Sequence, residues 1–166
     1  YPEDLGGTPA PHALRLVMWR ALCRHGTSGG VQASLLSHNI GLPPVVALAN
    51  DDVKREVVPP VLAGERIAAL AITEPGGGSD VSQLKTTARR DGDGWVINGM
   101  KHYITDGDIA HVAIVTAVTD LAKGPKGIST FLLERGMPGY SIGRVQDMMG
   151  QRGLNHAELF FDNVRV

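Results

Sequence analysis

One stretch divides the chain, and in it an apolar run breaks into proline, three glycines and a serine: Leu70-Ala71-Ile72-Thr73-Glu74-Pro75-Gly76-Gly77-Gly78-Ser79-Asp80. Before it, apolar residues recur at helical spacing, and after it they alternate with polar residues as in strands. Because glycine has no Cβ, the backbone N–H groups of this turn are able to close around an anion such as a phosphate. The same residue types also mark a simple corner between two kinds of structure, and the stretch alone leaves both interpretations open.

The residues before this stretch predict short helices. The segment from Val31 to Ile40 is almost entirely apolar, so we expect it to be buried, and the glycines between residues 26 and 30 should separate it from the helix before it. Asp51 is expected to cap the last helix, which should end before Pro59. The predicted helical ranges are 12–24, 31–40, 43–50 and 52–58.

The residues after the stretch predict short strands separated by Asp-Gly, Gly-Pro and Pro-Gly turns, at 67–72, 86–90, 94–98, 101–105, 112–118, 128–134, 140–145 and 158–161. No segment between them is long enough for a crossover helix, which excludes a parallel dinucleotide-binding sheet around the glycines. We therefore predict an α+β chain in which an N-terminal α-helical segment, residues 1–64, precedes an antiparallel β-barrel or sandwich domain, residues 65–166.

Composition excludes several classes of function. With 16 basic and 17 acidic residues scattered along the chain, there is no electrostatic footprint for nucleic acid or an anionic membrane. No apolar run approaches the roughly 20 residues that a membrane-spanning helix needs. Cys23 is the only cysteine, which excludes an internal disulfide, and no secretory signal is apparent. We expect a reducing compartment, the cytoplasm or, in a eukaryote, the mitochondrial matrix. The ends at Tyr1 and Val166 suggest a piece of a longer protein.

Other reactive residue types give weak signals. The six histidines show no paired ligand spacing, so no metal site is predicted. Cys23 lies within the first helical pattern, where a packed side chain is expected rather than a nucleophile. On the predicted strand 101–105, Tyr103 and Thr105 are two residues apart, so a stacking ring and a hydroxyl are expected on the same face. That pattern also fits ordinary packing on a sheet.

Together, the runs 72–80 and 97–105 closely resemble the acyl-CoA dehydrogenase family. The resemblance continues at 59–65, 149–153 and 161–166, in the order found in the family, and covers most of the chain. It implies a protein with an N-terminal helical domain, a middle β-domain and a C-terminal four-helix domain. Residues 1–64 would be the end of the first domain and residues 65–166 the second, while the third is absent from this chain.

The resemblance also implies a set of binding residues. FAD would lie with its isoalloxazine ring against the strands at 70–73 and 103–105, where Thr73 bonds the polar edge of the ring and Thr105 the N5 side. Ser79 and the glycines before it would reach the pyrophosphate, and Ser79 and Ser129 would lie near the acyl-CoA substrate. The implied cofactor-binding residues are Leu70, Ile72, Thr73, Gly78, Ser79, Tyr103, Ile104 and Thr105.

The family reaction removes two hydrogens from an acyl-CoA, and its glutamate base belongs to the absent domain. No catalytic residue is therefore assigned here, and Glu74 is expected to form a structural salt bridge. The resemblance further implies an acceptor of the electron-transfer flavoprotein type and a homodimer or homotetramer.

The sequence departs from the family pattern at three places. Tyr103 stands where tryptophan is usual, Leu70 where many members have an aromatic or other residue, and residues 154–156 where many have a serine and a threonine. Two alternatives stay open, an acyl-CoA oxidase or related flavin oxidase or monooxygenase, and a cofactor-free scaffold domain.

Overall fold

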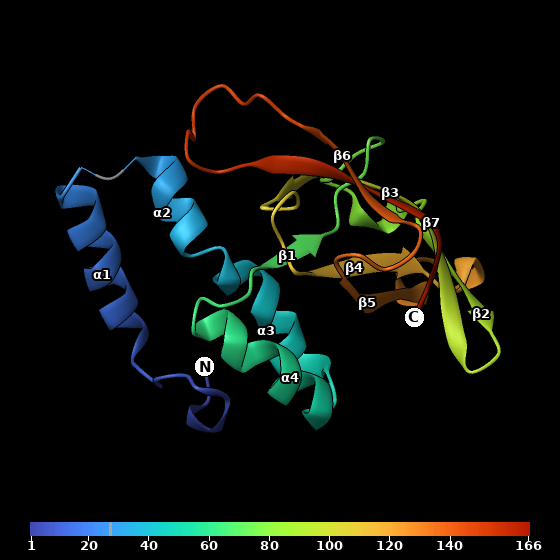
Figure 1. Ribbon diagram of the computed structural model, residues 1–166, viewed down its shortest axis with the longest axis horizontal. Helices are drawn as coiled ribbons and strands as arrows, with labels where there is room; N and C mark the ends of the chain where they lie inside the picture. Colours follow the sequence, from blue (N-terminus) through green and yellow to red (C-terminus); the bar gives the residue numbers. More distant parts are fainter. Residues whose placement is uncertain (27) are drawn as a thin grey trace.

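The computed structural model describes residues 1–26 and 28–166, in which helices precede a curled, open sheet (Figure 1). The α-helices are α1 (His12–Arg24), α2 (Gly29–Leu35), α3 (His38–Leu48) and α4 (Asp51–Leu62). The strands are β1 (Ala68–Ala71), β2 (Thr87–Asp91), β3 (Gly94–Thr105), β4 (Val112–Val118), β5 (Ile128–Glu134), β6 (Tyr140–Val145) and β7 (His156–Arg165). Short 3-10 turns are η1 (Glu3–Leu5), η2 (Val81–Gln83) and η3 (Leu121–Gly127). The α+β class is confirmed.

The strands form one sheet in the order β1-β4-β2-β3-β7-β6, with β5 on the other edge of β4. Most neighbours are antiparallel, but β1 is parallel to β4, and β2 is parallel to β4 at Thr87 and Val118. The prediction of a purely antiparallel sheet is therefore wrong. In the chain, the hairpin β2–β3 lies between β1 and β4. It returns the chain so that β4 can run parallel to β1, and this crossover therefore needs no long helix.

The pair β1 and β4 is covered on both faces, which explains why both strands are apolar except for Thr116. On one face, Ala69, Ala71 and Val115 belong to the core of the curled sheet. On the other face, Val112 and Ile114 pack against α3 and α4 in a second core. The members of this second core are Leu5, Leu42, Val45, Val57, Val58, Val61, Ala68, Val112 and Ile114. Helices and sheet therefore share β1, the strand that leads into the glycine-rich turn.

Two helices continue through proline pairs that were predicted to begin or end them. Pro43 and Pro44 lie inside α3, and Pro59 and Pro60 lie inside α4. Proline removes a helical hydrogen bond, and burial of neighbouring apolar side chains in the second core offsets this loss. The cap of α4 is also one residue earlier than predicted, because Asn50 Oδ1 accepts the Val53 N–H at 2.9 Å.

The predicted buried helix 31–40 is wrong. The segment divides into α2 and the start of α3, and the Leu35 side chain is 59% exposed. One side of α2 instead approaches the loop between β6 and β7, where a Cβ at Gly30 would lie 2.2 Å from the Arg152 carbonyl oxygen. Cys23 is exposed rather than packed. The predicted break at residues 26–30 includes Thr27, which lies outside the described residues.

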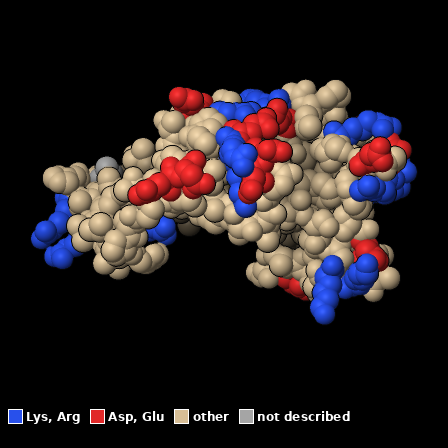
Figure 2. All heavy atoms as spheres, turned by 90° about the horizontal axis from the view of Figure 1, so that it is seen from below, with Lys and Arg blue, Asp and Glu red and all other residues tan. Residues whose placement is uncertain are grey.

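Helix α1 stands apart from the sheet (Figure 1) and has no buried residue, although it carries the apolar residues Leu14, Leu16 and Val17. No helix in the described part of the chain is long and apolar enough to cross a membrane. On the face drawn in Figure 2, acidic and basic side chains lie next to each other rather than in large regions of a single sign.

Candidate functional site

The glycine-rich turn follows β1 and is closed by its own backbone. The Glu74 N–H donates to the Gly77 carbonyl at 3.2 Å, and the Gly77 N–H donates to the Glu74 carbonyl at 3.0 Å. The N–H groups of Gly76, Gly78 and Ser79 make no hydrogen bond to any other residue that the structure describes, and all three residues are exposed. These donors are therefore free to bind an anion, which is one of the two interpretations that the sequence left open for this turn.

Thr73 lies directly beside this turn. A Cβ at Gly78 would meet the Thr73 Cγ2 at 2.9 Å, so this position accommodates only glycine without a shift. The Thr73 carbonyl accepts the His102 N–H at 2.8 Å, which places Thr73 against β3. The structure therefore brings together three of the predicted site residues, Thr73, Gly78 and the neighbouring Ser79, next to the strand that carries Tyr103.

Tyr103 and Thr105 flank the buried Ile104 on β3, at a point where the pairing of the strand is irregular. The pairing of β3 with β7 is irregular between Lys101 and Ile104, and Tyr103 adopts a left-handed conformation with φ of 56°. A β-bulge of this kind adds a residue and interrupts the alternation of side chains. Tyr103, which is 50% exposed, and Thr105 line two different cavities.

The cavity at Tyr103 has a volume of about 510 Å³ and contains polar residues that sequence reasoning missed. His102 Nδ1 lies 3.3 Å from Glu158 Oε1, and the Arg144 N–H donates to Glu158 Oε2 at 3.1 Å. The rings of His102 and Tyr103 meet edge to face, with centroids 4.1 Å apart. The alternation of β7 predicted a strand around Glu158, but the partner of its side chain depends on the pairing of β3 with β7.

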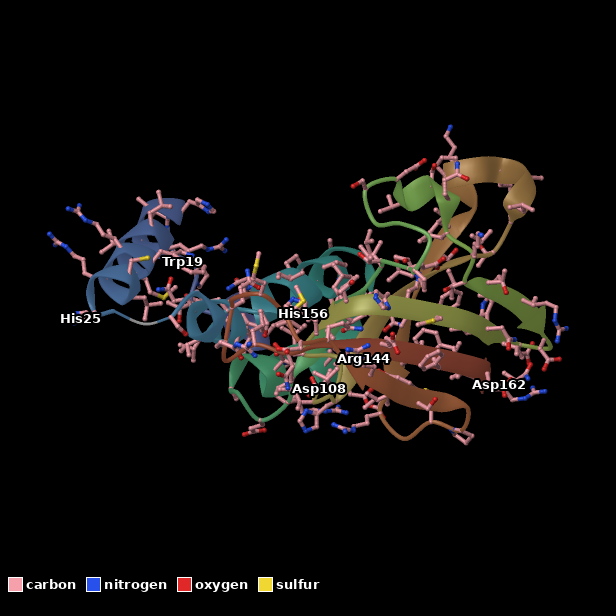
Figure 3. The ribbon with its side chains drawn as sticks, turned by 90° about the horizontal axis from the view of Figure 1, so that it is seen from above. Trp19, His25, Asp108, Arg144, His156 and Asp162 are labelled. Carbon is pink, nitrogen blue, oxygen red and sulfur yellow. The ribbon has the colours of Figure 1, made fainter. Side chains whose placement is uncertain are left out.

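The cavity at Thr105 has a volume of about 360 Å³ and lies between the helices and the start of β7. Thr105 pairs with His156 in the sheet. Trp19 of α1 and His156 both line the cavity, and Figure 3 labels these two residues. Next to Thr105, Asp106 is buried, and burial raises the pKa of its carboxyl although a hydrogen bond from Ser37 opposes the shift. Residues of the helical segment and of the end of β3 therefore line this cavity together.

The other predicted site residues have different surroundings. The Ile104 side chain is 2% exposed and lies in the core of the sheet, and the half-buried Leu70 packs against the helical core. Ile72 is half-buried, and its carbonyl accepts a hydrogen bond from Lys101 Nζ at 3.0 Å. Ser129 lies near the start of β5, with its hydroxyl 2.9 Å from that of Thr119. The buried Ile104 thus offers only backbone atoms to a ligand.

The predicted structural salt bridge of Glu74 is confirmed. Its partner is Lys101, with Nζ 2.8 Å from Glu74 Oε1 and exposed side-chain fractions of 0% and 7% for lysine and glutamate. Burial alone would raise the pKa of Glu74, but hydrogen bonds from Lys101, Thr86 and the Lys85 amide hold it below its ordinary value. Burial lowers the pKa of Lys101, and the Glu74 carboxylate opposes that shift. The pair is a charged element of the structure rather than a free base.

Comparison with known proteins identifies the class. Residues 69–164 match the family described as acyl-CoA dehydrogenase, middle domain. The chain therefore belongs to the acyl-CoA dehydrogenase family of flavoprotein oxidoreductases.

Its relatives include the human mitochondrial short-chain specific acyl-CoA dehydrogenase, which is 37% identical over 99% of this chain and 40% of its own length. Among solved structures, the acyl-CoA dehydrogenase from Geobacillus kaustophilus superposes with a TM-score of 0.86 at 37% identity, covering 100% of this chain and 44% of its own. A prolyl acyl carrier protein oxidase gives a TM-score of 0.79 at 36% identity, over 82% of this chain and 36% of its own. The chain spans about 40% of the length of the first of these relatives.

Proposed function

We propose that the protein containing this chain is an FAD-dependent acyl-CoA dehydrogenase that introduces an α,β double bond into an acyl-CoA thioester. The observation that carries this proposal is the group of three unused backbone donors beside Thr73 and Tyr103, in a chain that belongs to this family. A scaffold domain has no need of free amides around an exposed glycine turn, which speaks against the cofactor-free alternative.

In this proposal the residues around the turn hold FAD. The N–H groups of Gly78 and Ser79, with the Ser79 hydroxyl, bind the pyrophosphate, and Thr73 bonds the polar edge of the ring. Tyr103 covers the ring, and Thr105 donates near N5. Leu70, Ile72 and Ile104 contribute backbone atoms of the supporting strands. Bound FAD supplies the hydride acceptor, while the residues of this chain orient it and bias its electronics.

Substrate contacts follow from the same arrangement. Ser79 is exposed just after the closed part of the turn, and Ser129 is the second residue proposed to contact the CoA portion of the substrate. No base is assigned within this chain, because the Glu74 carboxylate is occupied by Lys101 and by the amides of Lys85 and Thr86. Proton abstraction from the substrate is therefore assigned to a part of the protein outside residues 1–166.

The domain assignment is part of the same proposal. Residues 1–64 are the end of a helical N-terminal domain and residues 65–166 a middle β-domain, with a C-terminal helical domain in the rest of the protein. We further propose a homodimer or homotetramer that delivers electrons to an electron-transfer flavoprotein and works in the cytoplasm or the mitochondrial matrix.

Ser79→Ala in the full-length protein is expected to weaken FAD binding about fivefold, because one hydrogen bond to the pyrophosphate is worth about 1 kcal/mol. The measurement is the dissociation constant of FAD from the apoprotein, followed by flavin fluorescence. Ser82→Ala is the matched control, since Ser82 lies three residues further on and its hydroxyl bonds Asp80. Equal dissociation constants for Ser79→Ala and the unmodified protein would contradict the role of Ser79.

Residues 1–166 alone are expected to fold but to bind FAD weakly and to turn over no acyl-CoA. The glycine turn and Tyr103 are exposed, and a flat cofactor on an open sheet makes few contacts and keeps water at N5. Titration of this chain with FAD, beside the full-length protein, tests the prediction. Saturable binding at submicromolar FAD, or dehydrogenation of any acyl-CoA, would contradict it.

The likeness to an oxidase gives the second candidate a specific basis. The two activities differ in what reoxidises the reduced flavin, so the test compares electron acceptors. For a dehydrogenase, full-length protein mixed with acyl-CoA passes electrons to an artificial or flavoprotein acceptor much faster than to oxygen. Rapid formation of peroxide in air would favour the oxidase.

A further inference from the structure

Lys101 is a fully buried lysine in the middle of the sheet, and every hydrogen on its ammonium group has an acceptor nearby. Its Nζ donates to the Ile72 carbonyl at 3.0 Å and to Glu74 Oε1 at 2.8 Å, and lies 3.4 Å from the Thr116 hydroxyl. A lysine side chain without exposed surface is rare unless it is paired. Because Lys101 lies on β3 and Thr116 on β4, the ammonium group connects the end of β1 to two other strands.

The Glu74 carboxylate extends this connection to the segment that leads into β2. Its Oε2 accepts the Lys85 N–H at 2.6 Å, and its Oε1 accepts the Thr86 N–H at 3.0 Å. These two amides lie after the glycine-rich turn, while Glu74 itself lies before it. The carboxylate therefore holds both ends of the turn together, and hydrogen bonds to a charged acceptor are stronger than those between neutral groups.

Three consecutive residues before the turn are thus tied to β3. Ile72 is held through its carbonyl by Lys101, Thr73 through its carbonyl by the His102 N–H at 2.8 Å, and Glu74 through its side chain. Two residues beyond Lys101, on the same strand, is Tyr103. The ion pair consequently sets the separation between the free amides of the turn and the aromatic ring, although both charged side chains are buried.

We propose that Lys101 and Glu74 are positioning residues of the cofactor site, which fix Thr73 and the glycine-rich turn relative to Tyr103 and Thr105. This inference rests on the proposed binding of FAD. Two apolar side chains of similar volume would fill the same space, but they would provide no directional bonds to the Ile72 carbonyl or to the Lys85 and Thr86 amides. The charged pair is therefore suited to hold one geometry of the turn.

The test uses the full-length protein with Glu74→Gln, which retains the shape of the side chain but removes its charge, and with Lys101→Met. Arg66→Met is the matched control, because Arg66 precedes β1 at its other end and pairs with Glu134 at 2.7 Å, away from the turn. FAD affinity of the apoprotein and visible circular dichroism of the bound flavin are measured under conditions in which each variant is folded. A purely structural pair would lower stability without changing either quantity in the folded protein.

Glu74→Gln is expected to weaken FAD binding about tenfold, in keeping with a weakened network of charged hydrogen bonds, and to change the circular dichroism of the flavin. Arg66→Met should bind FAD within about twofold of the unmodified protein, as expected for a partly exposed pair. If Lys101→Met fails to fold, Glu74→Gln carries the test. Variants that are folded and bind FAD with unchanged affinity and spectrum would overturn the inference.

A second measurement does not depend on the cofactor. In the apoprotein, hydrogen exchange at the amides of Gly77, Thr86 and His102 should become at least about tenfold faster in Glu74→Gln, relative to core amides such as Val115 and Leu133. Unchanged relative exchange would overturn the anchoring itself. Failure of the unmodified protein to bind FAD would instead overturn the proposed function, and the exchange result would still decide whether the pair anchors the turn.

Discussion

Lys101→Met is expected to lower the free energy of unfolding by about 3–5 kcal/mol, the range for removing one partner of a buried ion pair. The loss arises because the Glu74 carboxylate, 7% exposed, would remain buried without its cation, and the Ile72 carbonyl would lose its donor. Urea unfolding of the chain, followed by far-ultraviolet circular dichroism, measures this quantity at neutral pH, where Glu74 is ionised.

Two further variants show whether the charge is responsible. Adding Glu74→Gln to Lys101→Met removes the stranded charge and should recover part of the loss. Arg66→Met removes the cation of the Arg66–Glu134 pair, whose side chains are 28% and 45% exposed, and should cost only about 0–1 kcal/mol. A loss below about 1 kcal/mol for Lys101→Met, close to that of Arg66→Met, would contradict the account of this pair.

Thr105→Ala in the full-length protein is expected to slow flavin reduction by acyl-CoA about 100-fold, the lower end of the range for removing one preorganised donor. FAD affinity should fall only about fivefold, because a single hydrogen bond contributes about 1 kcal/mol to binding. The difference arises since the proposed Thr105 hydroxyl acts where charge develops during reduction. Anaerobic stopped-flow measurement of flavin bleaching, together with an FAD titration, separates the two effects.

Thr105→Ser is the control for this experiment. Serine keeps the hydroxyl and removes only a methyl group, so the reduction rate should stay near that of the unmodified protein. A Thr105→Ala variant that reduces its flavin at the original rate would remove Thr105 from the site. The result would also show whether the cavity lined by Thr105 belongs to the cofactor site.

Much of the sheet was predictable from local patterns. The ranges of β4, β5 and β6 coincide with the predicted strands, because clear turn signals bound each of them. The predicted division of β3 into the ranges 94–98 and 101–105 was wrong. Instead Gly99 adopts φ of 148° within a continuous strand, where a Cβ would lie 2.7 Å from the Thr86 Cα.

Features that depend on residues far apart in the sequence were harder to predict. The parallel pairing of β1 with β4 depends on the path of the whole β2–β3 hairpin, and helix α3 tolerates Pro43 because Leu42 and Val45 pack in a core made partly by the sheet. A proline in the sequence predicts the end of a helix from local structure alone, whereas tertiary packing decides whether the helix continues through it.

In the candidate site, too, some features could be predicted from the sequence and others could not. The glycine turn and its free amides could be predicted, since glycine and proline act locally. The bulge between Lys101 and Ile104 could not be predicted, because it is a property of the pairing of β3 with β7. Lys101 gave no signal of its own: a lysine in a strand is normally exposed, and only the fold places Glu74 within 2.8 Å of it.

The central claim is that the protein containing this chain oxidises an acyl-CoA with bound FAD. The most direct test is an anaerobic titration of the full-length, FAD-reconstituted protein with acyl-CoA thioesters of increasing chain length, recorded as the visible absorption spectrum of the flavin. We expect at least one thioester to bleach the flavin and to yield the α,β-unsaturated product. A full-length protein that acquires no flavin spectrum with FAD, or whose bound flavin stays oxidised with every thioester, would contradict it.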